Sequence, residues 1–217
     1  MIIFDLDGTL WDSAVSVADS WNIEIERVTG EISRITPDDI RRNMGKTMNE
    51  IADDVMSEFP PAKRYELARK CEVFENAYIT EHGGELFSGV RETLDALHRA
   101  GIPMSIVSNC QEGYVPAFLD SMDMRQYFAD YEEWGRSGLL KADNIRLVME
   151  RNCIDRAVYV GDIQKDADAS AEAGVPCIWA SYGFGHIDEP AGVLNEFSDL
   201  PGVLSRLGYT GGIDEAE

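Results

Sequence analysis

The chain has 217 residues, of which 44% are hydrophobic and 27% are charged. This composition is typical of a soluble globular protein that is long enough for one domain with a smaller inserted one. The formal net charge of −21 argues against nucleic-acid or anionic-membrane partners. No apolar run approaches the roughly 18 to 20 residues of a membrane span. The four cysteines lack zinc or redox spacing, so we expect reduced, mostly buried thiols in a cytoplasmic protein.

The N-terminal run Met1–Phe4 predicts a buried strand rather than a signal peptide, and an acidic segment follows it. Residues 4–10 read Phe-Asp-Leu-Asp-Gly-Thr-Leu. Side chains at i and i+2 leave the same face of a strand, so Asp5 and Asp7 should lie side by side at its carboxyl end. Like charges held this close need a metal ion, a proton or hydrogen bonds to offset their repulsion. An ordinary acidic turn also explains Asp7-Gly8, so these residues alone leave both interpretations open.

Residues 14 to about 82 have a helical pattern and no convincing strand. Apolar residues at helical spacing between Ala14 and Val28 predict a helix that ends at Gly30. Thr36-Pro37 and the capping box at Thr47 predict the starts of two further helices, and Pro61 opens a long one. The sequence therefore predicts an all-helical insert over residues 14–83.

Strands and helices alternate from residue 84 onward, which predicts a parallel sheet with helices on both faces. The helices are expected at 88–100, before Met122, from Lys141 and at 167–173, and the strands at 102–107, weakly at 127–129, and at 157–160 and 175–179. The predicted fold class is therefore α/β, with a doubly wound parallel sheet in a Rossmann-like core formed by residues 1–13 and 84–208. Residues 209–217 are expected to form a flexible tail.

The segment Asp5-Leu6-Asp7-Gly8-Thr9 resembles the first signature of the haloacid dehalogenase superfamily in its phosphatase form. The three other signatures of that superfamily follow in the right order, and the resemblance spans residues 1 to about 183. They are matched by Ser108, by Lys141 and by Gly161-Asp162-Ile163-Gln164-Lys165-Asp166. Among the branches of the superfamily, the chain looks most like the phosphoglycolate phosphatase group, whose helical cap would correspond to residues 14–83.

The resemblance implies a phosphomonoester hydrolase that acts on a small phosphorylated metabolite through an aspartyl-phosphate. Asp5 would be the nucleophile. Asp7 would protonate the leaving alcohol and then activate water, which requires a raised pKa. Ser108 and Lys141 would bind the phosphate, and Lys141 would also pair with Asp5. Backbone N–H groups around Gly8 and Asn109 would add donors.

The resemblance also implies a Mg²⁺ site, which would let several carboxylates face a phosphate. Its ligands would be Asp5, Asp162 and the backbone carbonyl of Asp7. Asp166 is expected to contact the ion directly or through an outer ligand, although a helix cap would explain it too. The expected partners are a phosphomonoester substrate and, at most, a second copy of the chain in a weak homodimer.

Several residues separate this chain from other branches of the superfamily. The second aspartate, Asp7, argues against a dehalogenase, and Gly161 argues less firmly against a phosphosugar mutase. The mutase remains an alternative, as does a non-catalytic protein that binds a phosphorylated ligand. In the insert, Arg42 and Lys46 lie in a segment that aligns loosely with the specificity loop of the family, which makes them candidate substrate-binding residues. A solvated helix face explains these two cations equally well.

Overall fold

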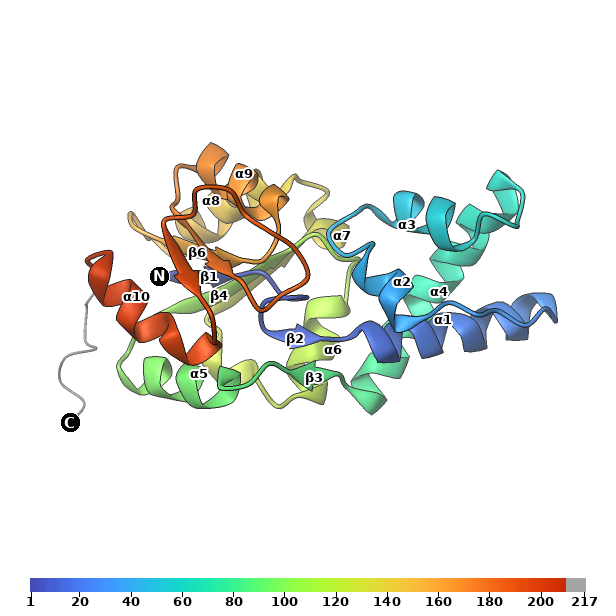
Figure 1. Cartoon of the computed structure of the whole chain (residues 1–217), viewed down its shortest axis with the longest axis horizontal. Coiled ribbons are helices and arrows are strands. Elements are labelled where there is room, and N and C mark those ends of the chain that lie inside the picture. The colour runs from blue at the N-terminus through green and yellow to red at the C-terminus, as the bar shows by residue number, and fades with distance from the viewer. Residues whose placement is uncertain (210–217) are drawn as a thin grey trace.

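The computed structural model describes residues 1–209, and its centre is a six-stranded sheet in which every neighbouring pair of strands is parallel (Figure 1). In spatial order the strands are β5 (Asp130–Glu133), β4 (Met104–Ser108), β1 (Ile2–Phe4), β6 (Val158–Gly161), β7 (Cys177–Ala180) and β8 (Gly192–Leu194). The α/β class and the parallel sheet predicted from the sequence are confirmed.

Helices cover both faces of the sheet because successive strand residues point to opposite sides. Ile2 and Phe4 of β1 contribute to one apolar core, whereas Ile3 contributes to the other. One face carries α5 (Val90–Arg99), α6 (Tyr114–Ser121) and α10 (Leu200–Arg206); the other carries α8 (Lys141–Arg151) and α9 (Gln164–Ala173) (Figure 1). The short helix α7 (Trp134–Ser137) follows β5 directly.

The order of the strands reverses next to β1. From β1 the chain moves outward to β4 and β5, and it then returns to the opposite side of β1 with β6. The carboxyl ends of β4, β1 and β6 are therefore neighbours at one edge of the sheet. In open α/β sheets, ligands bind in the crevice at such a reversal.

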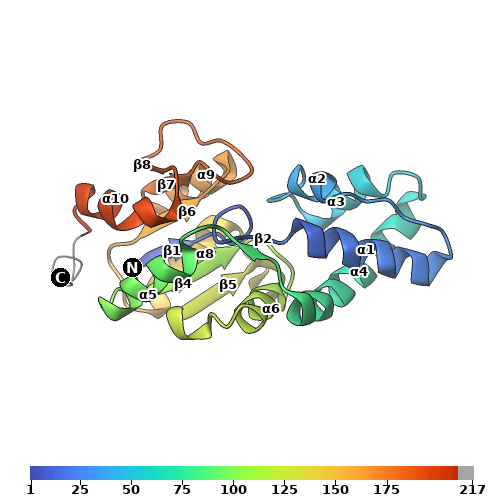
Figure 2. The same cartoon turned by 60° about the horizontal axis from the view of Figure 1, so that its bottom comes forward.

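Four helices stand beside this edge of the sheet as a separate group, with α1 and α4 forming its long pair (Figure 2). They are α1 (Ala14–Thr29), α2 (Pro37–Arg41), α3 (Met48–Val55) and α4 (Pro61–His82). The helix ends follow the signals in the sequence: Gly30 ends α1 at φ 73°, and capping boxes at Thr36 and Thr47 begin α2 and α3. Trp21 of α1 and Leu67 of α4 are buried in the core of this group. We refer to residues 14–83 as the cap.

A two-stranded antiparallel ribbon joins the cap to the sheet domain. Its strands are β2 (Trp11–Asp12) and β3 (Glu85–Leu86), which pair Trp11 with Leu86. Each strand is too short to give an alternating pattern, and the partners are far apart in the sequence. The ribbon was therefore not predicted.

Three features at the carboxyl-terminal half differ from the expectations. The strand expected at 127–129 begins later, at Asp130, because residues 125–127 form a 3₁₀ turn. The strand β8 and the helix α10 were not expected. Tyr209, assigned above to the tail, is half-buried and donates a hydrogen bond to the carbonyl of Ala157 (2.9 Å), so it packs with the sheet domain. The rest of the expected tail, residues 210–217, lies outside the described residues.

None of the helices described over residues 1–209 combines the length and apolar character needed to cross a lipid bilayer.

Candidate active site

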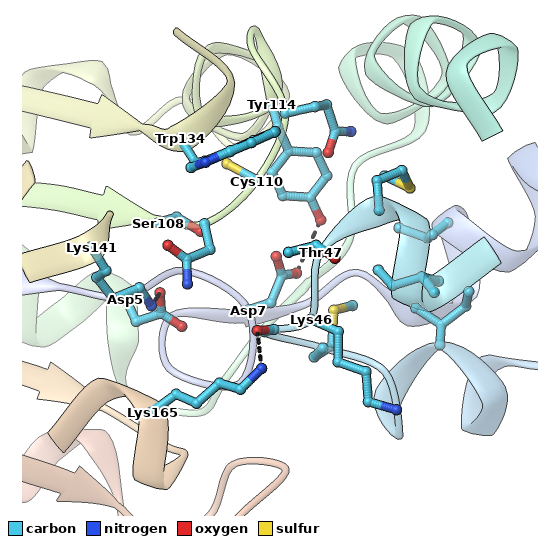
Figure 3. A pocket seen from close by; sticks show the side chains of 18 of the residues that line it. Asp5, Asp7, Lys46, Thr47, Ser108, Cys110, Tyr114, Trp134, Lys141 and Lys165 are labelled. Atoms are coloured by element: carbon cyan, nitrogen blue, oxygen red, sulfur yellow. Dashed lines mark hydrogen bonds and ion pairs between the residues drawn. The ribbon is translucent and has the colours of Figure 1, made fainter. Parts of the chain in front are cut away.

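The functional candidates converge where the three central strands end. Asp5 follows β1, Ser108 is the last residue of β4, and Asp162 follows β6. These three side chains and Lys141, the first residue of α8, line one cavity of about 200 Å³ between the sheet domain and the cap. Asp5, Ser108 and Lys141 are labelled in Figure 3. Asn109 lines the cavity as well, next to Ser108. Sequence positions more than 150 residues apart are thus brought together by the parallel register of β4, β1 and β6.

A buried lysine lies between two buried carboxylates at the floor of the cavity. Lys141 Nζ donates to Asp5 Oδ1 at 2.8 Å and to Asp166 Oδ1 at 2.5 Å. Burial alone would lower the pKa of Lys141, but the charges of Asp166 and Asp5 outweigh it and raise that pKa, so the side chain is cationic. Burial raises the pKa of Asp5 to about 7 even though Lys141 opposes this shift. The floor therefore offers a fixed positive charge beside a carboxylate.

Asp5, Asp162 and Asp166 form a buried acidic group in which each supplies an oxygen within 4.8 Å of the others. Both oxygens of Asp166 are engaged, because Oδ1 accepts from Lys141 and Oδ2 accepts from the N–H groups of Asp162 (3.1 Å) and Ile163 (3.2 Å). Asp166 thus caps the start of α9, and Asp5 and Asp162 keep oxygens available to an ion. Burial, Asp166 and Asp5 raise the pKa of Asp162 to about 8.

Two glycines lie against the side chain of Asp162, where any larger residue would collide with it. Gly8 has φ 80°, a conformation that favours glycine, and a Cβ at this position would collide with the carboxylate of Asp162. Gly183, in the loop after β7, packs against the carbonyl of Gly8 and the side chain of Asp162, whose Oδ2 accepts a hydrogen bond from the N–H of Phe184 at 2.8 Å. Hard carboxylate oxygens held in a tight backbone cradle fit a small divalent cation such as Mg²⁺.

The carboxyl group of Asp7 points away from this acidic group and toward the cap. It accepts a hydrogen bond from Ser13 Oγ (2.6 Å), and the hydroxyl of Tyr114 lies 3.0 Å from Asp7 Oδ1 and 2.8 Å from Ser13 Oγ, so its one proton is shared between these two acceptors. Burial raises the pKa of Asp7 to about 6, although the two hydrogen bonds act against this shift. Ser13 and Tyr114 were not predicted from the sequence. Ser13 precedes the first cap helix, which was a usable signal, whereas nothing local marks Tyr114.

The two cap cations proposed from the sequence have different positions. Lys46 lines the cavity, and its Nζ donates to Asn43 Oδ1 at 2.8 Å. Arg42 does not line it: its side chain is 61% exposed, pairs with Asp39 at 2.6 Å and borders a separate surface hollow. The assignment of Arg42 to the substrate site is therefore corrected, because the turns between α2 and α3 bring Lys46 to the cavity and leave Arg42 at the separate hollow.

The structure adds three charged residues that the sequence analysis did not single out. Lys165 of α9 lines the cavity and donates to the carbonyl of Gly45 at 3.3 Å, which links the sheet domain to the cap (Figure 3). Glu72 and Glu75 of α4 line the cap side. Lys165 lies inside the fourth signature and could have been noticed there. Glu72 and Glu75 could not have been identified from the sequence, because nothing distinguishes them from the other polar residues of a long helix.

Comparison with known proteins agrees with this geometry. Residues 2–180 match the family model described as haloacid dehalogenase-like hydrolase, and the chain belongs to this family. It is a hydrolase of the phosphatase kind. Curated relatives include the phosphoglycolate phosphatases of Pseudomonas fluorescens (31% identical, 94% of this chain and 79% of the relative covered) and Photobacterium profundum (28% identical, 94% of each covered).

Solved structures share the fold. A predicted phosphoglycolate phosphatase from Haemophilus somnus superposes with a TM-score of 0.77 at 20% identity, over 92% of this chain and 95% of that one. CbbY from Rhodobacter sphaeroides, solved in complex with phosphate, superposes with a TM-score of 0.70 at 19% identity, over 92% and 95% of the two chains. At these identities the likeness concerns the arrangement of the sheet and the helices.

Proposed function

We propose that the chain is a Mg²⁺-dependent phosphomonoesterase that hydrolyses a small phosphorylated metabolite through an aspartyl-phosphate on Asp5. The observation that carries this proposal is the convergence of Asp5, Ser108, Lys141 and Asp162 on one cavity. Phosphoryl transfer requires an in-line nucleophile and neutralisation of the equatorial oxygens, and this group of side chains offers both.

The phosphoryl group would lie at the floor of the cavity. Asp5 Oδ1 accepts from Lys141, which leaves the second oxygen of Asp5 to attack phosphorus. Lys141 and the hydroxyl of Ser108 would then hold the phosphate oxygens, with Asn109 beside them. Attack breaks the bond to the leaving oxygen, so the alcohol departs on the side opposite Asp5.

Asp7 is the proposed acid and base. A pKa of about 6 means that its carboxyl group is partly protonated near neutral pH, as protonation of a leaving alcohol requires. The same group, once ionised, would take a proton from the water that hydrolyses the aspartyl-phosphate. Asp5 and Asp162, with the backbone carbonyl of Asp7, would hold Mg²⁺, which when bound neutralises charge on the phosphate. Asp166 would orient Lys141 and the loop that carries Asp162.

The relatives named above suggest phosphoglycolate as one substrate to test. The function itself is tested with p-nitrophenyl phosphate and Mg²⁺. We expect turnover that chelator abolishes, and a phosphoryl adduct on the peptide containing Asp5 when the reaction is quenched and examined by mass spectrometry.

The matched variant is Asp5→Asn, which removes the nucleophile at nearly constant volume. Its turnover should fall by at least about 10³-fold, as for loss of other catalytic nucleophiles, while its thermal unfolding stays cooperative. Turnover within tenfold of the parent would refute the covalent mechanism, and full turnover in excess chelator would refute the metal assignment.

A further inference from the structure

Beyond Asp7, the cavity continues into the cap, where its wall is mainly apolar. Five side chains from three helices form this part of the wall: Val17 and Trp21 of α1, Ile40 of α2, and Met48 and Ile51 of α3. Trp21 is almost fully buried, so this wall is part of the packed cap core and does not depend on exposed side chains. If the phosphoryl group lies at the floor, the leaving alcohol must lie against this wall.

Two glutamates of α4 lie on the same side of the cavity, and burial raises the pKa of both, so that Glu75, with a pKa of about 7, is partly ionised near neutral pH, while Arg69 opposes the shift at Glu72. Glu75 is 3% exposed, and its two oxygens accept from the indole N–H of Trp21 and from Gln111 Nε2 (2.8 Å). Glu72 is half-buried and, within the part of the chain that the structure describes, accepts no side-chain hydrogen bond. Each carboxylate therefore retains acceptor capacity toward the cavity.

The cations of the cavity lie elsewhere. Lys141 is at the phosphate end, between Asp5 and Asp166. Lys46 and Lys165 lie where the cap loop meets α9, and their ammonium groups are bonded to Asn43 and to the carbonyl of Gly45. In Figure 3 the ammonium group of Lys46 points away from Asp7. Positive charge thus surrounds the phosphoryl end and the rim, while the cap end combines apolar side chains with carboxylates.

We propose that the preferred substrate is a phosphomonoester of a mainly apolar alcohol that carries a neutral or cationic hydrogen-bond donor and no carboxylate. This inference rests on the proposed phosphatase function and specifies its substrate class. An apolar skeleton replaces water along the wall, and a donor satisfies Glu72 or Glu75. A carboxylate of the substrate at this end would lose its hydration and face Glu72 and the partly ionised Glu75. Phosphoglycolate, whose leaving group ends in a carboxylate, is therefore expected to be a poor substrate.

Three synthetic esters of equal chain length test the proposal: pentyl phosphate, 5-aminopentyl phosphate and 5-phosphooxypentanoate. With Mg²⁺ present, we expect kcat/KM for the amino ester to exceed that for the carboxylate ester by about tenfold or more, because like charges repel at the cap end. Pentyl phosphate should also exceed the carboxylate ester. If the carboxylate ester has the highest kcat/KM, the proposal is overturned, and Lys46 or Lys165 becomes the selecting residue.

Substitutions in α4 test whether Glu72 causes the preference for the amino ester over the carboxylate ester. Glu72→Gln removes one charge at nearly constant volume and should reduce the amino-to-carboxylate ratio of kcat/KM several-fold, and Glu72→Lys should reduce it further. Glu66→Gln, on the exposed side of the same helix, is the control and should leave the ratio unchanged. An unchanged ratio in both Glu72 variants also overturns the proposal. If p-nitrophenyl phosphate is not hydrolysed either, the phosphatase function fails, and this inference fails with it.

Discussion

The carboxyl groups of Asp5 and Asp7 have different surroundings although only Leu6 separates them. Asp5 accepts from Lys141 at the floor of the cavity, whereas Asp7 accepts from Ser13 and Tyr114 on the cap side. The lysine supplies a full positive charge and the hydroxyl groups supply only dipoles. In the proposed mechanism, position separates the two roles, because Asp5 lies at the floor beside Lys141 and Asp7 lies on the side of the leaving alcohol. Without an ion the pKa of Asp5 is about 7 and that of Asp7 is about 6, and a bound Mg²⁺ would favour the ionised form of Asp5.

Tyr114 is expected to position Asp7, and a substitution distinguishes this role from a structural one. Tyr114→Phe should lower kcat by about tenfold or more for alkyl phosphates, whose leaving alcohols need a proton, since general acids contribute about 10² to 10⁴. Aryl phosphates with acidic phenols should lose much less. The measurement is kcat for a series of esters that differ in the pKa of the leaving group.

Tyr65→Phe is the control, because the Tyr65 hydroxyl contacts Asp53 in the cap and lies outside the cavity wall. If Tyr114→Phe slows aryl and alkyl esters equally, Tyr114 acts on cap folding or phosphate binding, and the positioning role is wrong.

At the scale of elements, the loop after β7 contacts the acidic group formed by Asp5, Asp162 and Asp166. This loop lies outside the four signatures. Gly183 approaches the carbonyl of Gly8 so closely that a methyl group there would displace one of the two segments. The N–H of Phe184 holds Asp162 Oδ2. Backbone from three parts of the chain thus defines the space in which Asp162 would meet an ion.

Gly183→Ala should therefore weaken Mg²⁺ activation. We expect the Mg²⁺ concentration for half-maximal activity to rise by about tenfold, and the free energy of unfolding to fall by about 1 to 3 kcal/mol from overpacking. Gly202→Ala is the control, because a Cβ there meets only the flexible end of Arg206 at 3.7 Å and Gly202 lies within α10. If both variants require the same Mg²⁺ concentration as the parent, the loop does not shape the metal site.

The segment between α2 and α3 offers a matched pair of cations for a second test at this scale. Lys46 lines the cavity and Arg42 does not. While leaving kcat/KM for the amino ester nearly unchanged, Lys46→Ala should lower kcat/KM for the carboxylate ester by a factor that corresponds to about 1 to 3 kcal/mol, as for loss of a charge-assisted hydrogen bond. Arg42→Ala should change it by less than threefold. Equal losses in the two variants would mean that the segment acts through cap folding instead.

For the whole molecule, we expect the buried carboxylates to make the free energy of unfolding depend on pH and on the proposed Mg²⁺. Burial raises the pKa of Asp7 to about 6, of Asp5 to about 7 and of Asp162 to about 8. Between their ordinary pKa values and these raised values, the folded protein binds more protons than the unfolded chain. The free energy of unfolding of the metal-free protein therefore falls as pH rises through this window. The net charge of −21 acts in the same direction.

We expect the melting temperature in chelator to fall by several degrees between about pH 5 and pH 8, since moving one carboxyl pKa from 3.8 to about 6 corresponds to about 3 kcal/mol. Mg²⁺ would bind the ionised carboxylates, so the increase in melting temperature that Mg²⁺ causes should be larger at higher pH. Calorimetry with and without Mg²⁺ measures both effects, and Asp162→Asn should reduce both. A Mg²⁺ stabilisation of equal size at the two pH values would contradict this linkage.

The sequence by itself determined the elements whose signals are local. Capping boxes, glycine stops and apolar runs marked most helices and strands. The four signatures identified Asp5, Ser108, Lys141 and Asp162 as candidates, because each signature is recognised from residues adjacent in the sequence. The ribbon β2–β3 and the strand β8 escaped, since two- or three-residue strands carry no periodic pattern and their partners are distant in the chain.

Only the tertiary structure decided which side chains share the cavity. Arg42 and Lys46 look alike in the sequence, and the turns between α2 and α3 place them at different hollows of the molecule. Tyr114 reaches Asp7, and Glu72 and Glu75 reach the cap end of the cavity, because α6 packs against β5 and α4 packs against α6. Such contacts depend on the relative placement of whole elements, which buried packing across the molecule sets and no local pattern encodes.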